Sequence, residues 1–135
     1  MNRFPGTIVA IEAAGGVALV DVAVGARRYT ATLIDAGGAP SWRVGMAVAL
    51  LFQETEVSLA KNLSGMISMR NRMVGTVTAV ERGRLLSKVT LDVDGHAVDA
   101  VITTRSCDAL QLALGDAVEG LVKANEMTLR EEGAA

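Results

Sequence analysis

The chain has 135 residues, 50% of them hydrophobic and 21% charged, so it can bury a core as one or two very small domains. A formal net charge of −2 and only 3% aromatic residues disfavour binding to nucleic acid or to an acidic membrane surface. The single cysteine, Cys107, cannot form an internal disulfide, and no apolar run approaches membrane-spanning length. We therefore expect a soluble cytoplasmic protein.

The first half of the chain recurs in the second half. Asn2–Glu12 aligns with Asn71–Glu81, and the match continues after one residue is gapped near Asp94. Later pairs include Gly25 with Gly95, Gly45 with Gly115, Ala47-Val48 with Ala117-Val118, Leu51 with Leu121, and Glu56 with Glu126. We interpret the chain as two homologous modules, residues 1–63 and 64–135, joined through Lys61–Met66.

Alternating apolar and polar residues predict five short strands in each module. In the first module they are Gly6–Glu12, Val17–Val24, Arg27–Ile34, Ala47–Phe52 and Glu56–Ala60. In the second they are Val74–Arg82, Leu85–Val93, His96–Thr103, Ala117–Lys123 and Met127–Arg130. Ser106–Leu112 is a helix candidate with Ser106 as its N-cap. The predicted fold class is all-β, with two tandem five-stranded OB-type Greek-key barrels, each with a short helix between strands 3 and 4.

Hydrogen-bond donors are concentrated in the second module. Ser68-Met69-Arg70-Asn71 precedes its first strand, and Thr103, Ser106 and Lys123 come from segments that a barrel can bring together. An oxyanion such as molybdate, tungstate or sulfate carries two negative charges and no hydrogen. Its site therefore needs donors and cations without a carboxylate. The pattern predicts a site for a small tetrahedral oxyanion.

The first module is an internal control for this prediction. Leu33, Ala36 and Gln53 align with Thr103, Ser106 and Lys123, and Met1 aligns with Arg70. The aligned positions thus lack both cations and both loop hydroxyls. We interpret the first module as structural, with a degenerate site, and the second module as the one that binds the anion.

Ser68–Val77 resembles the Ser-Ala-Arg-Asn-x-x-x-Gly-x-Val opening of the molybdenum-pterin-binding (Mop) or TOBE family, with Met69 where the family usually has Ala. Val101–Ser106, Leu112–Gly115 and Leu121–Ala124 continue the resemblance in order, and the tandem pair is similar to a molbindin. The resemblance implies molybdate or tungstate bound at interfaces between chains. In the implied site one chain contributes Ser68, the Met69 backbone and Arg70, and another contributes Thr103, Ser106, Lys123 and the Ala124 backbone.

The leading interpretation is molybdate or tungstate binding for intracellular storage, homeostasis or sensing. One alternative is a regulatory module that senses molybdate for a transporter or a transcription regulator. Another is an OB-fold nucleic-acid module, which the charge and the low aromatic content oppose. No nucleophile–base or carboxylate pair predicts an enzyme, and we expect a metal only within the oxyanion.

We also expect a homo-oligomer. Sites that combine first and second modules would lack donors, which favours a two-fold homodimer with facing second modules. The trimer implied by the resemblance remains the alternative.

Overall fold

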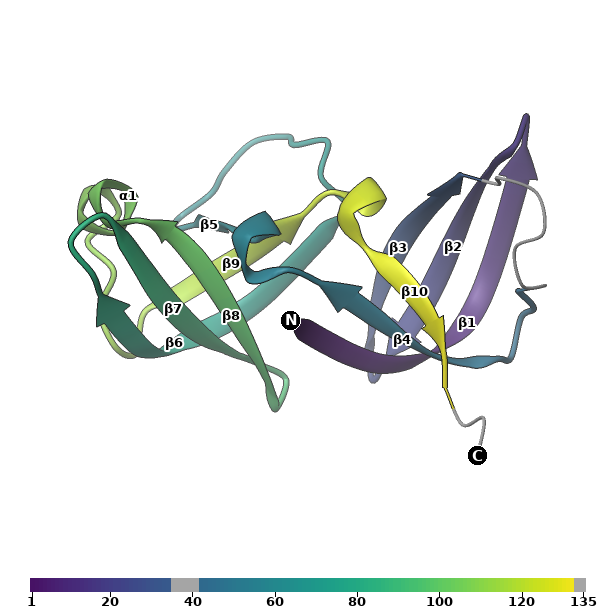
Figure 1. The fold of residues 1–135 in the computed structure, drawn as a ribbon, viewed down its shortest axis with the longest axis horizontal. Helices are drawn as coiled ribbons and strands as arrows, with labels where there is room; N and C mark the ends of the chain where they lie inside the picture. Colours follow the sequence, from purple (N-terminus) through teal and green to yellow (C-terminus); the bar gives the residue numbers. More distant parts are fainter. Residues whose placement is uncertain (35–41, 133–135) are drawn as a thin grey trace.

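The structure is a computed structural model that describes residues 1–34 and 42–132. It contains two five-stranded antiparallel sheets that lie side by side (Figure 1). The first repeat forms β1 (Asn2–Ala14), β2 (Val17–Val24), β3 (Arg27–Ile34), β4 (Ala47–Phe52), the 3₁₀ turn η1 (Glu54–Glu56) and β5 (Ser58–Ala60). The second repeat forms β6 (Asn71–Arg82), β7 (Leu86–Val93), β8 (His96–Thr103), α1 (Thr104–Ala109), β9 (Ala117–Val122), the 3₁₀ turn η2 (Ala124–Glu126) and β10 (Thr128–Glu131).

The predicted all-β fold with two five-stranded OB-type units is confirmed. A short helix follows strand 3 of the second repeat, whereas its expected counterpart in the first repeat falls at residues 35–41, outside the described residues. In the part of the chain that the structure describes, every helix is too short to cross a lipid bilayer.

Strand ends differ from the prediction mainly where β1 and β6 begin. Both strands start earlier, because Asn2 pairs with Phe52 and Asn71 pairs with Val122 in the antiparallel ladders. β5 is shorter than the predicted Glu56–Ala60. There the chain turns through η1, and the backbone N–H of Gln53 donates to Glu56 Oε1 over 3.0 Å.

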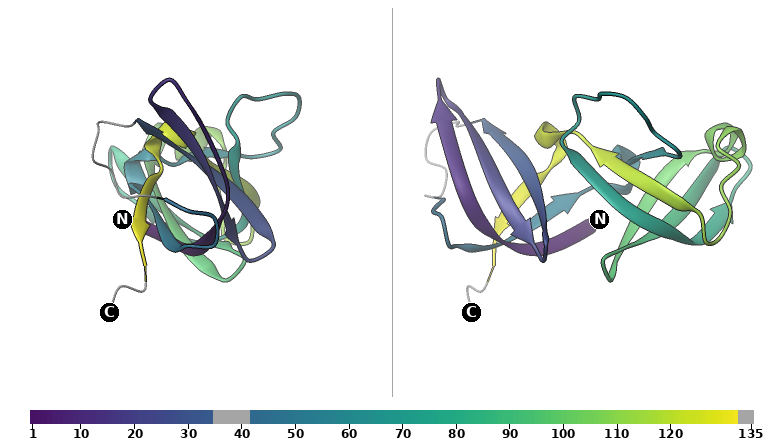
Figure 2. Two further views of the ribbon diagram at one scale, coloured as in Figure 1. Left: turned by 90° about the vertical axis from the view of Figure 1, so that its right-hand side faces the viewer. Right: turned by 180° about the vertical axis from the view of Figure 1, so that it is seen from behind.

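Each sheet contains one strand from the other repeat. The strand orders are β10-β4-β1-β2-β3 and β5-β9-β6-β7-β8. Figure 2 shows β10 running from the second repeat onto the sheet of the first, and β5 reaching the opposite way. The exchanged strands satisfy the edges of β4 and β9, which would otherwise present unpaired backbone groups. The halves 1–63 and 64–135 therefore each build most of one sheet and one strand of the other.

The exchange joins the two repeats through a common core. One cluster of buried residues contains Phe4, Ile8 and Phe52 from the first repeat together with Met73, Val77 and Leu91 from the second. The exchanged Val57 and Leu129 belong to the same cluster. A repeat of this size would bury little apolar surface alone, so sharing the core stabilises both.

Two buried asparagines also fasten each repeat to an edge strand of the other. The Asn71 amide accepts the Thr30 N–H over 2.8 Å and donates to the Thr30 carbonyl over 2.9 Å. At the equivalent place, the Asn2 amide accepts the Asp99 N–H and donates to the Asp99 carbonyl, both over 2.8 Å. A side-chain amide supplies one donor and one acceptor, as a strand partner would. We call these contacts the Asn71 clasp and the Asn2 clasp.

The strand registers also correct the alignment of the repeats. Val17 pairs with Ile34 in β2–β3, and its counterpart Leu86 pairs with Thr103 in β7–β8. The structural counterpart of Thr103 is therefore Ile34, not Leu33. The gapped residue lies between Ile34 and Ala47 rather than near Asp94, because the turns Gly25-Ala26 and Asp94-Gly95 are equally long. Ile34 lacks a donor, as Leu33 does, so the contrast between the modules is unchanged.

Candidate functional site

Two cations and a short run of polar residues meet beside β6 and β9. We call this depression the cationic hollow; it is lined by Thr32, Ser68, Met69, Arg70, Lys123, Ala124 and Asn125. Ser68–Arg70 ends the connection between β5 and β6, and Lys123 is the N-cap of η2 directly after β9. Asn71 and Val122 are the terminal pair of the β6–β9 ladder. The residues just before Asn71 and just after Val122 are therefore neighbours, which brings Arg70 and Lys123 together.

The electrostatics of the cationic hollow favour an anion. Its lining includes no aspartate or glutamate. Within residues 1–34 and 42–132, neither Arg70 nor Lys123 takes part in an ion pair, and both are exposed. Two neighbouring uncompensated cations repel each other, and an anion between them would remove that repulsion. The guanidinium, the ammonium and the Ser68 hydroxyl can all donate hydrogen bonds to it.

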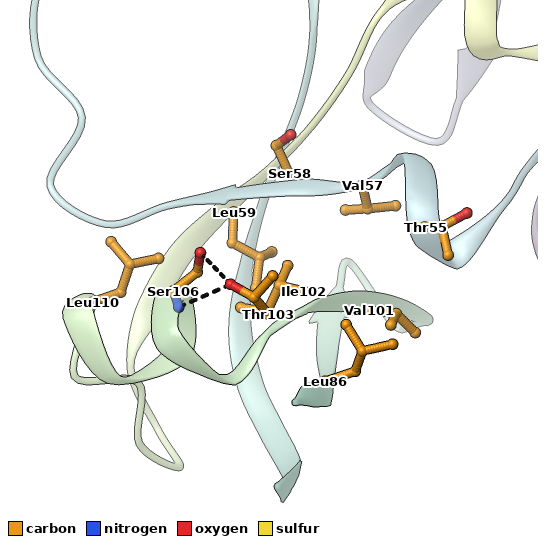
Figure 3. A pocket seen from close by; sticks show the side chains of 10 residues that line it. All are labelled: Thr55, Val57, Ser58, Leu59, Leu86, Val101, Ile102, Thr103, Ser106 and Leu110. Atoms are coloured by element: carbon orange, nitrogen blue, oxygen red, sulfur yellow. Dashed lines mark hydrogen bonds between the residues drawn. The ribbon is translucent and has the colours of Figure 1, made fainter. Parts of the chain in front are cut away.

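Thr103 and Ser106 lie in a different depression, which we call the hydroxyl groove. It is lined by Thr55, Val57, Ser58, Leu59, Leu86, Val101, Ile102, Thr103, Ser106 and Leu110 (Figure 3). Its walls come from η1 and β5 of the first repeat and from β7, β8 and α1 of the second. The groove is mostly apolar and, like the cationic hollow, has no carboxylate in its lining.

The prediction that Ser106 is the N-cap of the helix is wrong, because Thr103 has that role. The Thr103 side chain accepts the Ser106 N–H over 3.1 Å, and its hydroxyl donates to Ser106 Oγ over 2.8 Å (Figure 3). The helix therefore spans Thr104–Ala109 instead of Ser106–Leu112. With the Thr103 hydroxyl hydrogen engaged, the Ser106 hydroxyl hydrogen can still be donated to a ligand.

The predicted site residues are grouped differently in the structure than the family resemblance implied. Lys123 and Ala124 lie beside Ser68, Met69 and Arg70 of the same chain. Thr103 and Ser106 are apart from them, in the hydroxyl groove. The reason is the β6–β9 register, which fixes Lys123 next to Arg70 within one chain.

Two carboxylates on and just before β9, those of Glu119 and Asp116, have cationic partners. Arg72 donates to Glu119 through Nε over 3.1 Å and through Nη2 over 2.7 Å, and this hydrogen bonding raises the pKa of Arg72. Lys61 Nζ donates to Asp116 Oδ2 over 3.0 Å, which lowers the pKa of Asp116. Lys61 also donates to the carbonyls of Leu110 and Gln111, so it ties the start of the β5–β6 connection to the end of α1.

Thr32 and Asn125 line the cationic hollow but were not predicted to do so. Asn125 follows Ala124 inside η2, where it could be read as a turn residue. Thr32 belongs to β3 of the first repeat, far from the other lining residues in sequence. No sequence signal distinguishes Thr32 from any other outward-facing strand threonine.

Comparisons with known proteins place these features in context. Residues 67–129 match the TOBE domain family. The chain is 37% identical over 126 residues to the molybdenum import ATP-binding protein ModC of Brucella abortus (strain 2308), covering 87% of this chain and 35% of ModC. It is 35% identical over 127 residues to the molybdenum transport protein ModE of Herbaspirillum seropedicae, covering 91% of this chain and 47% of ModE. The chain thus spans only a third to a half of these curated relatives.

A solved structure resembles nearly the whole chain. A crystal structure of the cytoplasmic molybdate-binding protein ModG, with molybdate bound, superimposes with a TM-score of 0.91. The sequence identity is 26%, and the match covers 96% of this chain and 95% of that one. The arrangement of both repeats, and not only the fold of each, is therefore shared with ModG.

Proposed function

Because the chain belongs to the molybdenum-pterin-binding (Mop/TOBE) family, in its tandem form, we propose that it binds molybdate or tungstate as an intact oxyanion. The observation that carries this proposal is the cationic hollow, where Arg70 and Lys123 meet with no carboxylate in the lining. The two side chains together balance the charge of a dianion. The Ser68 hydroxyl and the backbone N–H groups of Met69 and Ala124 are additional donors to its oxygens.

Arg70 and Lys123 are exposed in the single chain, so one chain alone leaves part of the anion in water. We propose that a second copy of the chain closes the cationic hollow with Thr103 and Ser106 of the hydroxyl groove, where Ser106 donates its hydroxyl hydrogen to the anion and Thr103 orients Ser106. Each chain would then supply Ser68, Met69, Arg70, Lys123 and Ala124 to one site and Thr103 and Ser106 to another. Removal of water strengthens every charged hydrogen bond in such a site. A two-fold homodimer and a trimer can both be built in this way, and the mass of the assembly in solution distinguishes them.

The biological role that fits this chemistry is reversible binding without turnover. We propose cytoplasmic storage or homeostasis of molybdate, in line with what ModG is described as doing, namely binding molybdate in the cytoplasm. The second candidate is a sensing module that acts on a transporter or a transcription regulator. The similarity to parts of ModC and ModE, both named for molybdenum transport, favours it. We propose no direct contact with nucleic acid or with a membrane.

Isothermal titration with molybdate, tungstate and sulfate tests the proposal. Lys123→Ala should abolish tight molybdate binding, because it removes one of the two cations, and should leave the fold intact because Lys123 is exposed. The matched control is Gln53→Ala, which changes the counterpart of Lys123 at the N-cap of η1 and should leave affinity unaltered. Equal affinity for wild type and Lys123→Ala would contradict the assignment of the cationic hollow. If molybdate, tungstate and sulfate all fail to bind, the proposed function itself is contradicted.

A further inference from the structure

The first repeat contributes one side chain to the wall of the cationic hollow, although its own equivalent site is degenerate. That side chain is Thr32 of β3, which lines the hollow together with Arg70 and Lys123. We propose that the Thr32 hydroxyl is a further ligand of the bound oxyanion, so that each site spans both repeats of one chain. This inference rests on the proposed function and extends its set of donors.

The Asn71 clasp explains how Thr32 reaches the site. Asn71 is fully buried, directly follows Arg70, and holds both backbone groups of Thr30. Along β3, Tyr29 and Ala31 point into the core, so Thr30 and Thr32 share the outward face. Fixing Thr30 beside Asn71 therefore fixes Thr32 beside the residues next to Asn71. The packing of η2 against β3 closes the same corner from the other side.

The second repeat supplies an internal comparison for the hydroxyl. The Asn2 clasp holds Asp99 of β8 with the same geometry, and two residues further along that strand stands Val101. At that equivalent corner, Gln53 and Glu54 take the places of Lys123 and Ala124. The scaffold is thus the same at both corners. Thr32 stands at the corner that has Arg70 and Lys123. At the corner that lacks these cations, Val101 and Glu54 occur instead.

Strand formation does not account for this difference. Threonine and valine are nearly isosteric, both are β-branched, and both suit an outward strand position. The Thr32 side chain is half-buried in a lining that it shares with both cations, so its hydroxyl can donate to an oxygen of a molybdate or tungstate ion, which has no hydrogen of its own. Such a charge-assisted hydrogen bond is about twice as strong as a neutral one. The hydroxyl is therefore expected to affect anion affinity more than stability.

The test is isothermal titration of molybdate into the full chain and its Thr32 variants. Thr32→Val should weaken binding about tenfold, the loss expected for one hydrogen bond to a charged group in a partly exposed site. Thr32→Ser keeps the hydroxyl and should stay within about threefold of wild type. The matched control Thr7→Val makes the same substitution at an exposed strand threonine that lines neither depression, and it should leave affinity and stoichiometry unchanged.

The outcomes separate this inference from the proposed function. If wild type binds molybdate and Thr32→Val binds equally tightly, Thr32 is not a ligand although the function stands. If wild type does not bind, both fail. Urea unfolding of each variant checks that the fold is retained. If Thr32→Val does not fold, Thr32→Ser and Thr32→Ala are compared instead, and equal affinities in that pair would also refute the inference.

Discussion

The Asn71 clasp and the Asn2 clasp should both stabilise the fold, but only the Asn71 clasp should affect anion affinity. Removing them one at a time tests this difference. Asn71→Ala removes two hydrogen bonds and leaves the Thr30 N–H and carbonyl, at an edge strand, without that partner. Each lost bond removes about 1 kcal/mol, and the unsatisfied backbone groups add to this, so the expected loss of unfolding free energy is about 2–4 kcal/mol. Asn2→Ala breaks the equivalent pair of bonds to Asp99 and should cost a similar amount.

Anion affinity should respond to only one of the two variants. The Asn71 clasp holds Thr30 next to the segment that carries Ser68 and Arg70, so its loss should weaken molybdate binding at least about tenfold. Loss of the Asn2 clasp acts at the equivalent corner, where Gln53 and Glu54 replace Lys123 and Ala124, and it should leave the affinity within about twofold of wild type. The assays are urea unfolding, followed by titration at a temperature where both variants are folded. Equal effects of both variants on affinity would refute the reasoning, as would a change in unfolding free energy below about 0.5 kcal/mol in both.

Two further predictions concern stability. Hydrogen bonds from Lys61 and from the Ala113 N–H lower the pKa of Asp116 from its ordinary value of 3.8. The ionised carboxylate therefore stabilises the fold at neutral pH, and this contribution is lost as the pH falls through the lowered pKa. The difference in unfolding free energy between wild type and Asp116→Asn should therefore shrink from neutral pH to about pH 2, and a constant difference would contradict this. Gly75→Ala would place a Cβ atom 2.6 Å from the Asp92 carbonyl oxygen and should destabilise the fold by more than about 2 kcal/mol in urea unfolding. At Gly120 the nearest atom to an added Cβ is the flexible end of Met73 at 3.0 Å, followed by Val57 and Leu91 side-chain atoms at 3.4 and 3.6 Å, so Gly120→Ala should cost less. The opposite order would show that the backbone at Gly75 can relax.

Local patterns in the sequence were enough to predict most of the strands. β2, β3, β4 and β8 have the predicted bounds, because period-two alternation over a half-buried sheet is a local property. Arg70 and Lys123 were predicted as partners because cations and hydroxyls without carboxylates are chemically distinctive, even far apart in sequence. The repeat also predicted that the first module lacks these donors.

Only the tertiary structure decided which donors meet. The register that ends at Asn71 and Val122 places Lys123 with Arg70 in one chain, and it separates both from Thr103 and Ser106. The exchange of β5 and β10 could not be predicted, because a strand has the same alternation whichever edge it joins. Thr32 gave no local signal, since threonine and valine suit a strand equally well. Its place in the cationic hollow follows from a contact between repeats, and such contacts depend on packing rather than on neighbouring residues.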